Sequence, residues 1–301
     1  MKSNFKILII LFLAISCTEE IKINLDSTYT RLIVYGEITT DTTTHYISLT
    51  KSMDYFEPRQ PYGISDAIVT LHWNDQSLLL VESNENKGIY QTPPDFYGIQ
   101  KTLYKLTIEN VDIDGDGEYE FYEAECYLKM FNPIDSITYD TKPIISIPGD
   151  TAKWINIKLW ALDPPTEDFY LLRWSLNDSL MSDSLRKWGF TDDIPFNGDS
   201  IHGFPILSLR QSTDSTAWWI YDNDLVSLEV SSISKEYFYF LLHCYEASGI
   251  QTPMTSSIPG NVKGNISNGA LGFFAAYGTS RASVVFREPE QWKKLKIKKQ
   301  R

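Results

Sequence analysis

The sequence predicts a mainly β protein, in which an N-terminal β-sandwich of the immunoglobulin or transthyretin type is followed by a second β-rich domain that carries one helix. The length of 301 residues, at about 150 residues per domain, suggests two domains. Short runs rich in Val, Ile, Thr and aromatic residues recur between turn signals at a spacing typical of sandwiches. Hydrophobic residues make up 43% and charged residues 22% of the chain, a composition that excludes disordered and collagen-like proteins.

The first residues have the pattern of a secretory signal peptide. Lys2 and Lys6 form a short positive region, and residues 7–15 are almost wholly apolar. This apolar run is much shorter than the roughly 20 residues that span a bilayer, which argues against a retained transmembrane helix. We therefore expect residues 1–16 to be removed.

Cys17 is the predicted lipid anchor. It follows the apolar run and a small residue, an arrangement that resembles the lipobox of bacterial lipoproteins, whose cysteine is acylated and becomes the mature N-terminus. Several acyl chains hold a protein at a membrane durably. Glu19 and Glu20 resemble the export tag that sends some Gram-negative lipoproteins to the outer face of the outer membrane, and residues 17–26 would then form a tether. Residues 14–16 also suit ordinary signal peptidase, so plain secretion is the alternative.

The first domain is predicted at residues 27–133. Its strand-like runs lie at residues 32–39, 46–50, 67–73, 77–81, 103–109 and 122–130. In the last run, apolar residues from Tyr122 to Met130 alternate with charged ones, so one face of the strand should be buried and the other exposed. Pro133 marks the expected domain boundary, and a stretch at residues 143–150 punctuates the chain soon after it.

The second domain is predicted at residues 134–286, where strand-like runs resume at 154–162 and 169–176. One helix is expected near residues 235–247, with Ser234 as its N-cap. Its apolar stripe, which we assign to the core, consists of Tyr237, Phe240, Leu241, Cys244 and Tyr245.

The charge of the chain argues against a nucleic-acid partner. The 27 basic and 39 acidic residues give a formal net charge of −12, and a negative protein repels a phosphate backbone. Six of the last nine residues are nevertheless basic. We expect residues 287–301 to form a solvated, disordered tail, with a tether to an anionic surface as the alternative.

Cys126 and Cys244 are the remaining cysteines, in a compartment that allows disulfides. The sequence leaves open whether they pair, and two separately buried thiols are the simpler expectation. The four histidines show no spacing typical of a zinc site, and the chain holds no nucleophile elbow, Walker A loop or dinucleotide fingerprint. We therefore predict no enzyme activity and no certain cofactor.

An acidic run that begins at Asp112 is the sharpest chemical motif. Carboxylates at alternate positions, with glycines between them, supply the hard oxygen ligands and the tight turn that a calcium ion requires. The candidate calcium ligands are Asp112, Asp114, Asp116, Glu118 and Glu120. The flanking residues are strand-like, which argues against the helix-loop-helix of an EF-hand. The alternative is an acidic hairpin tip that binds no ion.

Trp218 and Trp219 are candidate ligand-binding residues. Neighbouring residues on a strand point to opposite faces, so one of the two could stack on a sugar ring or an apolar ligand. The alternative is that one side chain belongs to the core and the other shields a sheet edge.

Several blocks, taken together and in order, resemble a known family. They are residues 34–39, 47–52, 66–71, 88–90, 192–193, 196–198, 231–242 and 265–274. This series is similar to that of the domain-of-unknown-function 4249 family, and it covers nearly the whole mature chain. In the last block, Gly269 and Gly272 predict turns or a close backbone approach that a β-carbon would forbid.

The resemblance implies a place and a neighbour, because members of that family are envelope lipoproteins of Gram-negative bacteria, commonly encoded beside TonB-dependent transporters. We therefore expect a surface-exposed outer-membrane lipoprotein, without enzyme activity, that assists such a transporter or captures its substrate. The acidic run and the tryptophan pair leave a second function open, a calcium-stabilised adhesion or glycan-binding module. An envelope hydrolase with an unrecognised site is a third alternative, which a cleft with convergent titratable groups would support.

Overall fold

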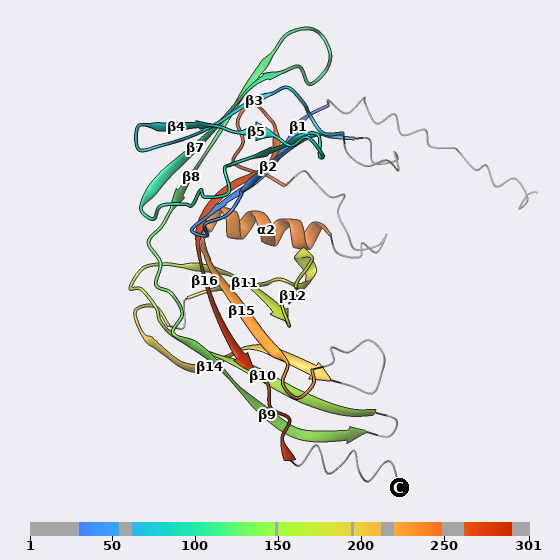
Figure 1. Cartoon of the computed structure of the whole chain (residues 1–301), viewed down its shortest axis with the longest axis vertical. Coiled ribbons are helices and arrows are strands. Elements are labelled where there is room, and N and C mark those ends of the chain that lie inside the picture. Colours follow the sequence, from blue (N-terminus) through green and yellow to red (C-terminus); the bar gives the residue numbers. More distant parts are fainter. Residues whose placement is uncertain are drawn as a thin grey trace, which may run out of the picture.

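The structure is a computed structural model that describes residues 30–53, 62–147, 150–193, 196–211, 220–248 and 262–290. Over these residues the chain is built almost entirely from β-strands in three sheets, with one α-helix and a single 3-10 turn (Figure 1). The predicted mainly β fold is therefore confirmed.

Nine strands form one long sheet that runs through both halves of the molecule. Its order is β12-β11-β15-β16-β1-β2-β6-β5, with β13 also paired to β11. The strands are β1 (Leu32–Thr39), β2 (Tyr46–Lys51), β5 (Val81–Glu82), β6 (Ile89–Gln91), β11 (Phe169–Leu176), β12 (Ser179–Leu180), β13 (Gly189–Asp192), β15 (Leu225–Ile233) and β16 (Leu271–Val285).

A four-stranded sheet completes the predicted N-terminal sandwich. Its order is β4-β3-β7-β8, and its strands are β3 (Ile68–Trp73), β4 (Gln76–Leu79), β7 (Thr102–Val111) and β8 (Glu120–Leu128). Side chains from this sheet, such as Leu71 and Leu106, form one core with Leu32 and Val34 of β1. Because β8 ends at Leu128, the predicted buried face stops there, and Met130 is 53% exposed.

A three-stranded sheet packs against the other half of the long sheet. It has the order β14-β10-β9, with β9 (Ser136–Ile147), β10 (Asp150–Leu162) and β14 (Ser200–Gln211). Strand β9 runs through Pro143, where the sequence predicted only punctuation. The strand lies at the edge of its sheet, and the pairing register shifts between Ala152 and Trp154 of β10. Edge strands and bulges tolerate proline, because no ladder hydrogen bond is needed from it there.

The helix α2 (Lys235–Ala247) covers the face of the long sheet opposite the three-stranded sheet (Figure 1). The side chain of Ser234 accepts a hydrogen bond from the backbone N–H of Tyr237, which confirms the predicted N-cap. Tyr237, Phe240 and Leu241 are buried in the predicted stripe. The stripe ends sooner than predicted, since Tyr245 is 44% exposed.

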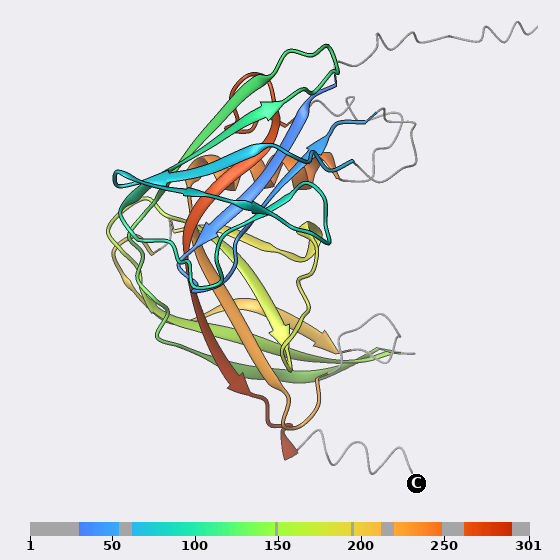
Figure 2. The same ribbon diagram turned by 45° about the horizontal axis from the view of Figure 1, so that its top comes forward.

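Strand β16 joins the two halves (Figure 2). Its first part pairs in parallel with β1, and its second part pairs antiparallel with β15. The close approach predicted at Gly272 is present: this residue lies opposite Val34, its φ is +95°, and an added β-carbon would lie 1.9 Å from the Val34 carbonyl oxygen. Pro133 lies between β8 and β9, but the parts on either side of it share β16.

Candidate functional site

A cavity of about 260 Å³ lies between the three-stranded sheet and the long sheet. Its walls are formed by strands of both sheets. Successive side chains on a strand point to opposite faces, so every second side chain of each strand points toward the cavity. Most of the lining is apolar, and it includes Leu159 of β10, Leu172 of β11 and Val230 of β15. Phe196 and Phe204 also line it, with ring centroids 4.7 Å apart in an edge-to-face arrangement. A ligand with an apolar body would therefore be well packed here.

Two carboxylates stand at the ends of strands in this cavity wall. Asp163 directly follows β10 and is 4% exposed, and Asp193 directly follows β13 and is 3% exposed. Asp163 accepts hydrogen bonds from the Tyr170 hydroxyl (2.7 Å) and from the backbone N–H of Gly198 (3.3 Å). Within the described part of the chain, the Oδ2 atom of Asp193 has no hydrogen-bond partner. A buried acceptor without a donor is costly, and a ligand that donates a hydrogen bond would satisfy this oxygen.

A third buried aspartate, Asp168, lies beside this pair. It is 2% exposed, its carbonyl oxygen accepts a hydrogen bond from the backbone N–H of Asp193 (3.2 Å), and its side chain accepts one from the Thr166 hydroxyl (2.6 Å). Among the described residues, Asp168 forms an ion pair with Lys129, whose Nζ atom lies 3.8 Å from the Asp168 Oδ1 atom. Asp163 has no such cation among the described residues.

Burial and the neighbouring negative charges raise the pKa values of two of these carboxyl groups. Burial raises the pKa of Asp163, the hydrogen bonds from Tyr170 and Gly198 act in the opposite direction, and the charges of Asp193 and Asp168 raise it further. Burial likewise raises the pKa of Asp168, against the hydrogen bond from its neighbouring threonine and the charge of the nearby lysine. A positive charge in the cavity would relieve this repulsion.

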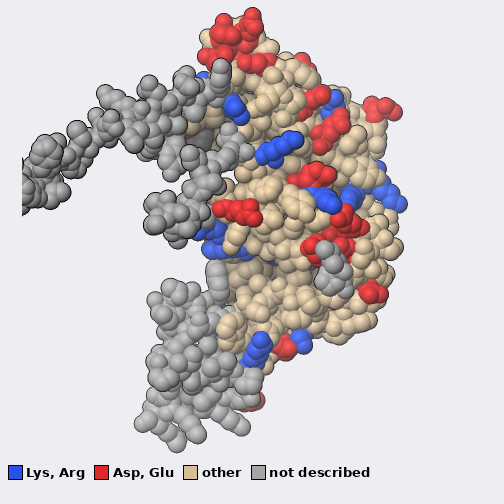
Figure 3. All heavy atoms as spheres, turned by 180° about the vertical axis from the view of Figure 1, so that it is seen from behind, with Lys and Arg blue, Asp and Glu red and all other residues tan. Residues whose placement is uncertain are grey.

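The predicted calcium motif forms the tip of the β7–β8 hairpin, at the end of the molecule where acidic side chains gather in Figure 3. Ligand oxygens of Asp112, Asp114 and Asp116 lie within 4.8 Å of one another. Glu118 and Glu120 are not part of this group, and Glu120 instead accepts a hydrogen bond from the N–H of the residue after Asp112 (3.2 Å).

The three aspartates also serve the loop itself. Asp112 accepts hydrogen bonds from the backbone N–H groups of Gly115 (2.7 Å) and Gly117 (3.1 Å). A calcium ion takes roughly six to eight oxygen ligands, so with one oxygen from each aspartate, backbone carbonyls or water would have to supply at least half of them. The strands on both sides agree with the expected hairpin, and calcium binding stays a prediction.

The other predicted site residues have different outcomes. Cys17, Trp218 and Trp219 lie outside the described residues. Cys126 and Cys244 are both free thiols, as the simpler expectation had it, but only Cys126 is buried and Cys244 is half-buried. No helix in the described part of the chain is both long and apolar enough to cross a membrane.

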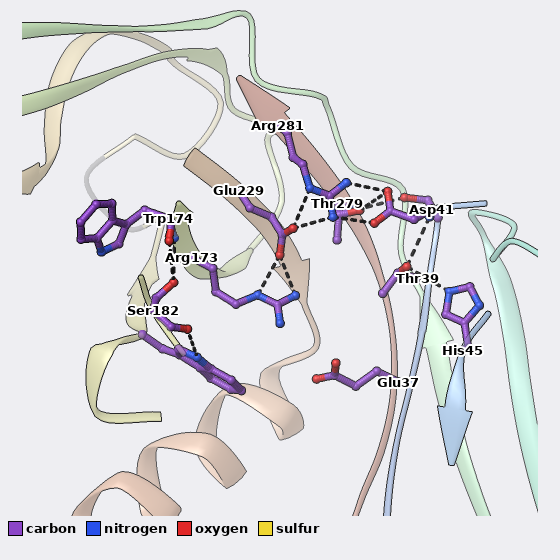
Figure 4. A network of polar contacts seen from close by, with 12 residues as sticks. Glu37, Thr39, Asp41, His45, Arg173, Trp174, Ser182, Glu229, Thr279 and Arg281 are labelled. Atoms are coloured by element: carbon purple, nitrogen blue, oxygen red, sulfur yellow. Dashed lines mark hydrogen bonds and ion pairs between the residues drawn. The ribbon is translucent and has the colours of Figure 1, made fainter. Parts of the chain in front are cut away.

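A second polar group lies on the helix-bearing face of the long sheet and was not predicted (Figure 4). The Arg173 guanidinium lies 2.6 Å from Glu229, and Arg281 lies 2.5 Å from Glu229 and 2.6 Å from Asp41. These residues come from β11, β15, β16 and the turn after β1, and each of the two arginines has an acidic partner. We interpret this chain of ion pairs as a clamp between the two halves and not as a binding site.

The cavity aspartates were not recognised as a site from the sequence. Asp193 stood only in a family-like block, and Asp163 only at the end of a strand-like run. The signal that could have found them is their position: an aspartate directly after a buried strand is placed at a sheet edge, where ligands commonly bind.

Comparison with known proteins gives one match over most of the chain. A family described as "Domain of unknown function (DUF4249)" matches residues 18–283. No curated protein matches the chain. Among solved structures, the apo structure of Bacteroides uniformis beta-glucuronidase 3 is matched with 11% identity and a TM-score of 0.22, over 67% of this chain and 23% of the other. The chain thus spans about a quarter of that enzyme's length, and a likeness this weak carries no conclusion about fold or activity.

Proposed function

We propose a function for this chain, which belongs to the DUF4249 family. In the proposal it is a lipid-anchored protein of the outer cell surface that captures a small ligand for a TonB-dependent transporter. In this proposal Cys17 holds the protein at the outer membrane, and residues 17–26 keep the folded part at a distance from the lipid. The protein binds its ligand and catalyses no reaction.

The observation that carries the proposal is the cavity between the two sheets. It is large enough for a small molecule, mostly apolar, and contains a few convergent polar groups, which is the usual character of a ligand site. Its lining residues in the described part of the chain include no histidine, cysteine or lysine. A histidine is the most frequent general base and cysteine and lysine are common nucleophiles, so the acid–base groups of this lining are its carboxylates.

The buried carboxylates are the observation that favours the alternative of a hydrolase. A pair of carboxyl groups can divide the roles of acid and base when both are free to meet the substrate. Here both oxygens of Asp163 already accept hydrogen bonds within the protein, and only Asp193 has an oxygen without a partner. Binding therefore accounts for the geometry better than two-carboxylate catalysis does.

The membrane and transporter parts of the proposal can be tested together. The chain, with an affinity tag, is extracted from membranes in mild detergent, and co-purified proteins are identified by mass spectrometry. We expect an acylated Cys17 at the mature N-terminus and a TonB-dependent transporter in the eluate.

The control for this experiment is Cys17→Ala. This variant should fold normally, be absent from the membrane fraction and purify without the transporter. An unmodified N-terminus in the wild type would contradict the anchor. An acylated protein that purifies without any transporter would contradict the partnership.

The acidic hairpin supports a second candidate function, the calcium-stabilised adhesion module. Three carboxylates within ligand distance of one another are the specific observation in its favour. Calcium-dependent binding to a glycan panel by the wild type, lost in Asp114→Ala, would support this function over ligand capture.

A further inference from the structure

We propose that the cavity binds a small organic cation, a protonated amine on an apolar body about the size of one aromatic ring, with the Asp193 carboxylate as its counter-ion. This inference rests on the proposed function, because it names the class of ligand that the cavity captures.

The volume sets the size of the ligand. A cavity of about 150 Å³ in a protein interior is enough to hold benzene. The cavity here measures about 260 Å³. One ring with a short substituent therefore fits, whereas an oligosaccharide does not.

The charge of the lining determines the sign of the ligand. Asp163, Asp192 and Asp193 all line the cavity, and the described lining residues include no basic side chain. Lys129 forms an ion pair with Asp168, and neither residue is among the lining residues. An anionic ligand would meet uncompensated negative charge in a medium of low dielectric constant, whereas a cation would neutralise it.

The free atom of Asp193 determines which group the ligand presents. An ionised carboxylate only accepts hydrogen bonds, so the ligand must donate one. The Oδ2 atom of Asp193 has no donor among the described residues, and the residue is buried, with 3% of its surface exposed to solvent. An ammonium group supplies both the donor and the opposite charge, and such charge-assisted bonds are roughly twice as strong as neutral ones.

Two further observations favour an organic cation over a metal ion. In the hairpin, three carboxylates lie within 4.8 Å of one another, close enough to share a metal ion. Among the described residues, the carboxylates of Asp163, Asp168 and Asp193 do not form such a group. The rings of Phe190, Phe196 and Phe204 line the same cavity, and aromatic rings attract organic cations as well as packing against an apolar body.

The test measures binding to the purified, detergent-solubilised full chain by isothermal titration calorimetry at pH 7. The three probes have similar size and differ in charge: phenethylamine, 2-phenylethanol and 3-phenylpropionate. We expect phenethylamine to bind about tenfold or more tightly than the alcohol, since the hydroxyl can donate a hydrogen bond to the carboxylate but carries no positive charge to pair with it. We expect no binding of 3-phenylpropionate.

Two variants assign the effect to its residue. Asp193→Asn should weaken phenethylamine binding by about tenfold and leave the affinity for 2-phenylethanol unchanged. The matched control is Asp178→Asn, since Asp178 is exposed in the β11–β12 turn and should leave every affinity unchanged. Thermal melting of both variants shows whether each is folded, and if Asp193→Asn does not fold, the comparison of the three probes on the wild type decides the question.

The outcomes separate this inference from the proposed function. If the alcohol binds as tightly as the amine, or if folded Asp193→Asn keeps full affinity for the amine, ligand capture stands and the cationic class is wrong. If none of the three probes binds, both the cationic class and the capture role are wrong. Tight binding of 3-phenylpropionate would also overturn the inference.

Discussion

Replacing Gly272 by alanine should separate the two halves of the protein at the strand that they share. Gly272 lies opposite Val34 in the parallel pairing of β16 with β1, and its φ is +95°. A non-glycine residue in such a conformation costs about 1–2 kcal/mol. The new β-carbon would also lie 1.9 Å from the Val34 carbonyl oxygen, whereas ordinary contacts begin near 3.4 Å.

The strands would therefore have to move apart by about 1.5 Å, which is enough to break one or two buried ladder hydrogen bonds at about 1–3 kcal/mol each. Adding the backbone strain, we expect Gly272→Ala to lower the free energy of unfolding by about 2–8 kcal/mol. The assay is urea denaturation followed by circular dichroism, with the midpoint and slope fitted for each protein.

Gly269→Ala is the matched control. Its φ is +72°, three residues away in the chain, but an added β-carbon there meets no atom within 4 Å. It should show the backbone strain alone, about 1–2 kcal/mol. If the two variants lose the same stability, the close approach of β16 to β1 does not contribute, and the reasoning from the Gly272 contact is wrong.

Three further predictions concern charge. Burial raises the pKa of Asp163, so the wild type loses stability as the pH rises through that pKa and the buried carboxyl group ionises. Asparagine does not ionise, so the Tm of Asp163→Asn minus that of the wild type should increase from about pH 4 to about pH 7. A flat or falling difference would contradict this. Arg281→Met should lose about 1 kcal/mol at low salt and less at high salt, and a double-mutant cycle with Asp41→Asn should show coupling between them; additive effects would refute the clamp. Millimolar calcium should raise the Tm of the wild type but not of Asp114→Ala, and no shift in the wild type would exclude the hairpin site.

Local pattern predicted those elements whose burial repeats within a few residues. The runs 32–39 and 169–176 match β1 and β11 in full, and the helix begins at its predicted N-cap, Ser234. The run 77–81 was divided, because β4 and β5 belong to different sheets, and no local pattern shows where a strand changes partners.

Turn chemistry misled the prediction at Pro143. Proline ordinarily interrupts a strand, but β9 is an edge strand, and only the sheet order reveals which strands lie at edges. The same limit applies to the candidate site. Asp163 and Asp193 are 30 positions apart, and a carboxylate at a strand end looks the same in sequence whether it faces solvent or a cavity.

The sequence by itself determined the mainly β class, the helix and its cap, the acidic hairpin between two strands and the glycine needed at position 272, because each follows from side-chain periodicity or from backbone conformation over a short stretch. Only the tertiary structure decided that β16 pairs with β1, that Arg281 meets Asp41, and that three aspartates converge beside an apolar cavity. These features depend on which distant strands are neighbours. The backbone groups that join strands are the same in every residue except proline, so a short stretch of sequence does not indicate which distant strand it pairs with.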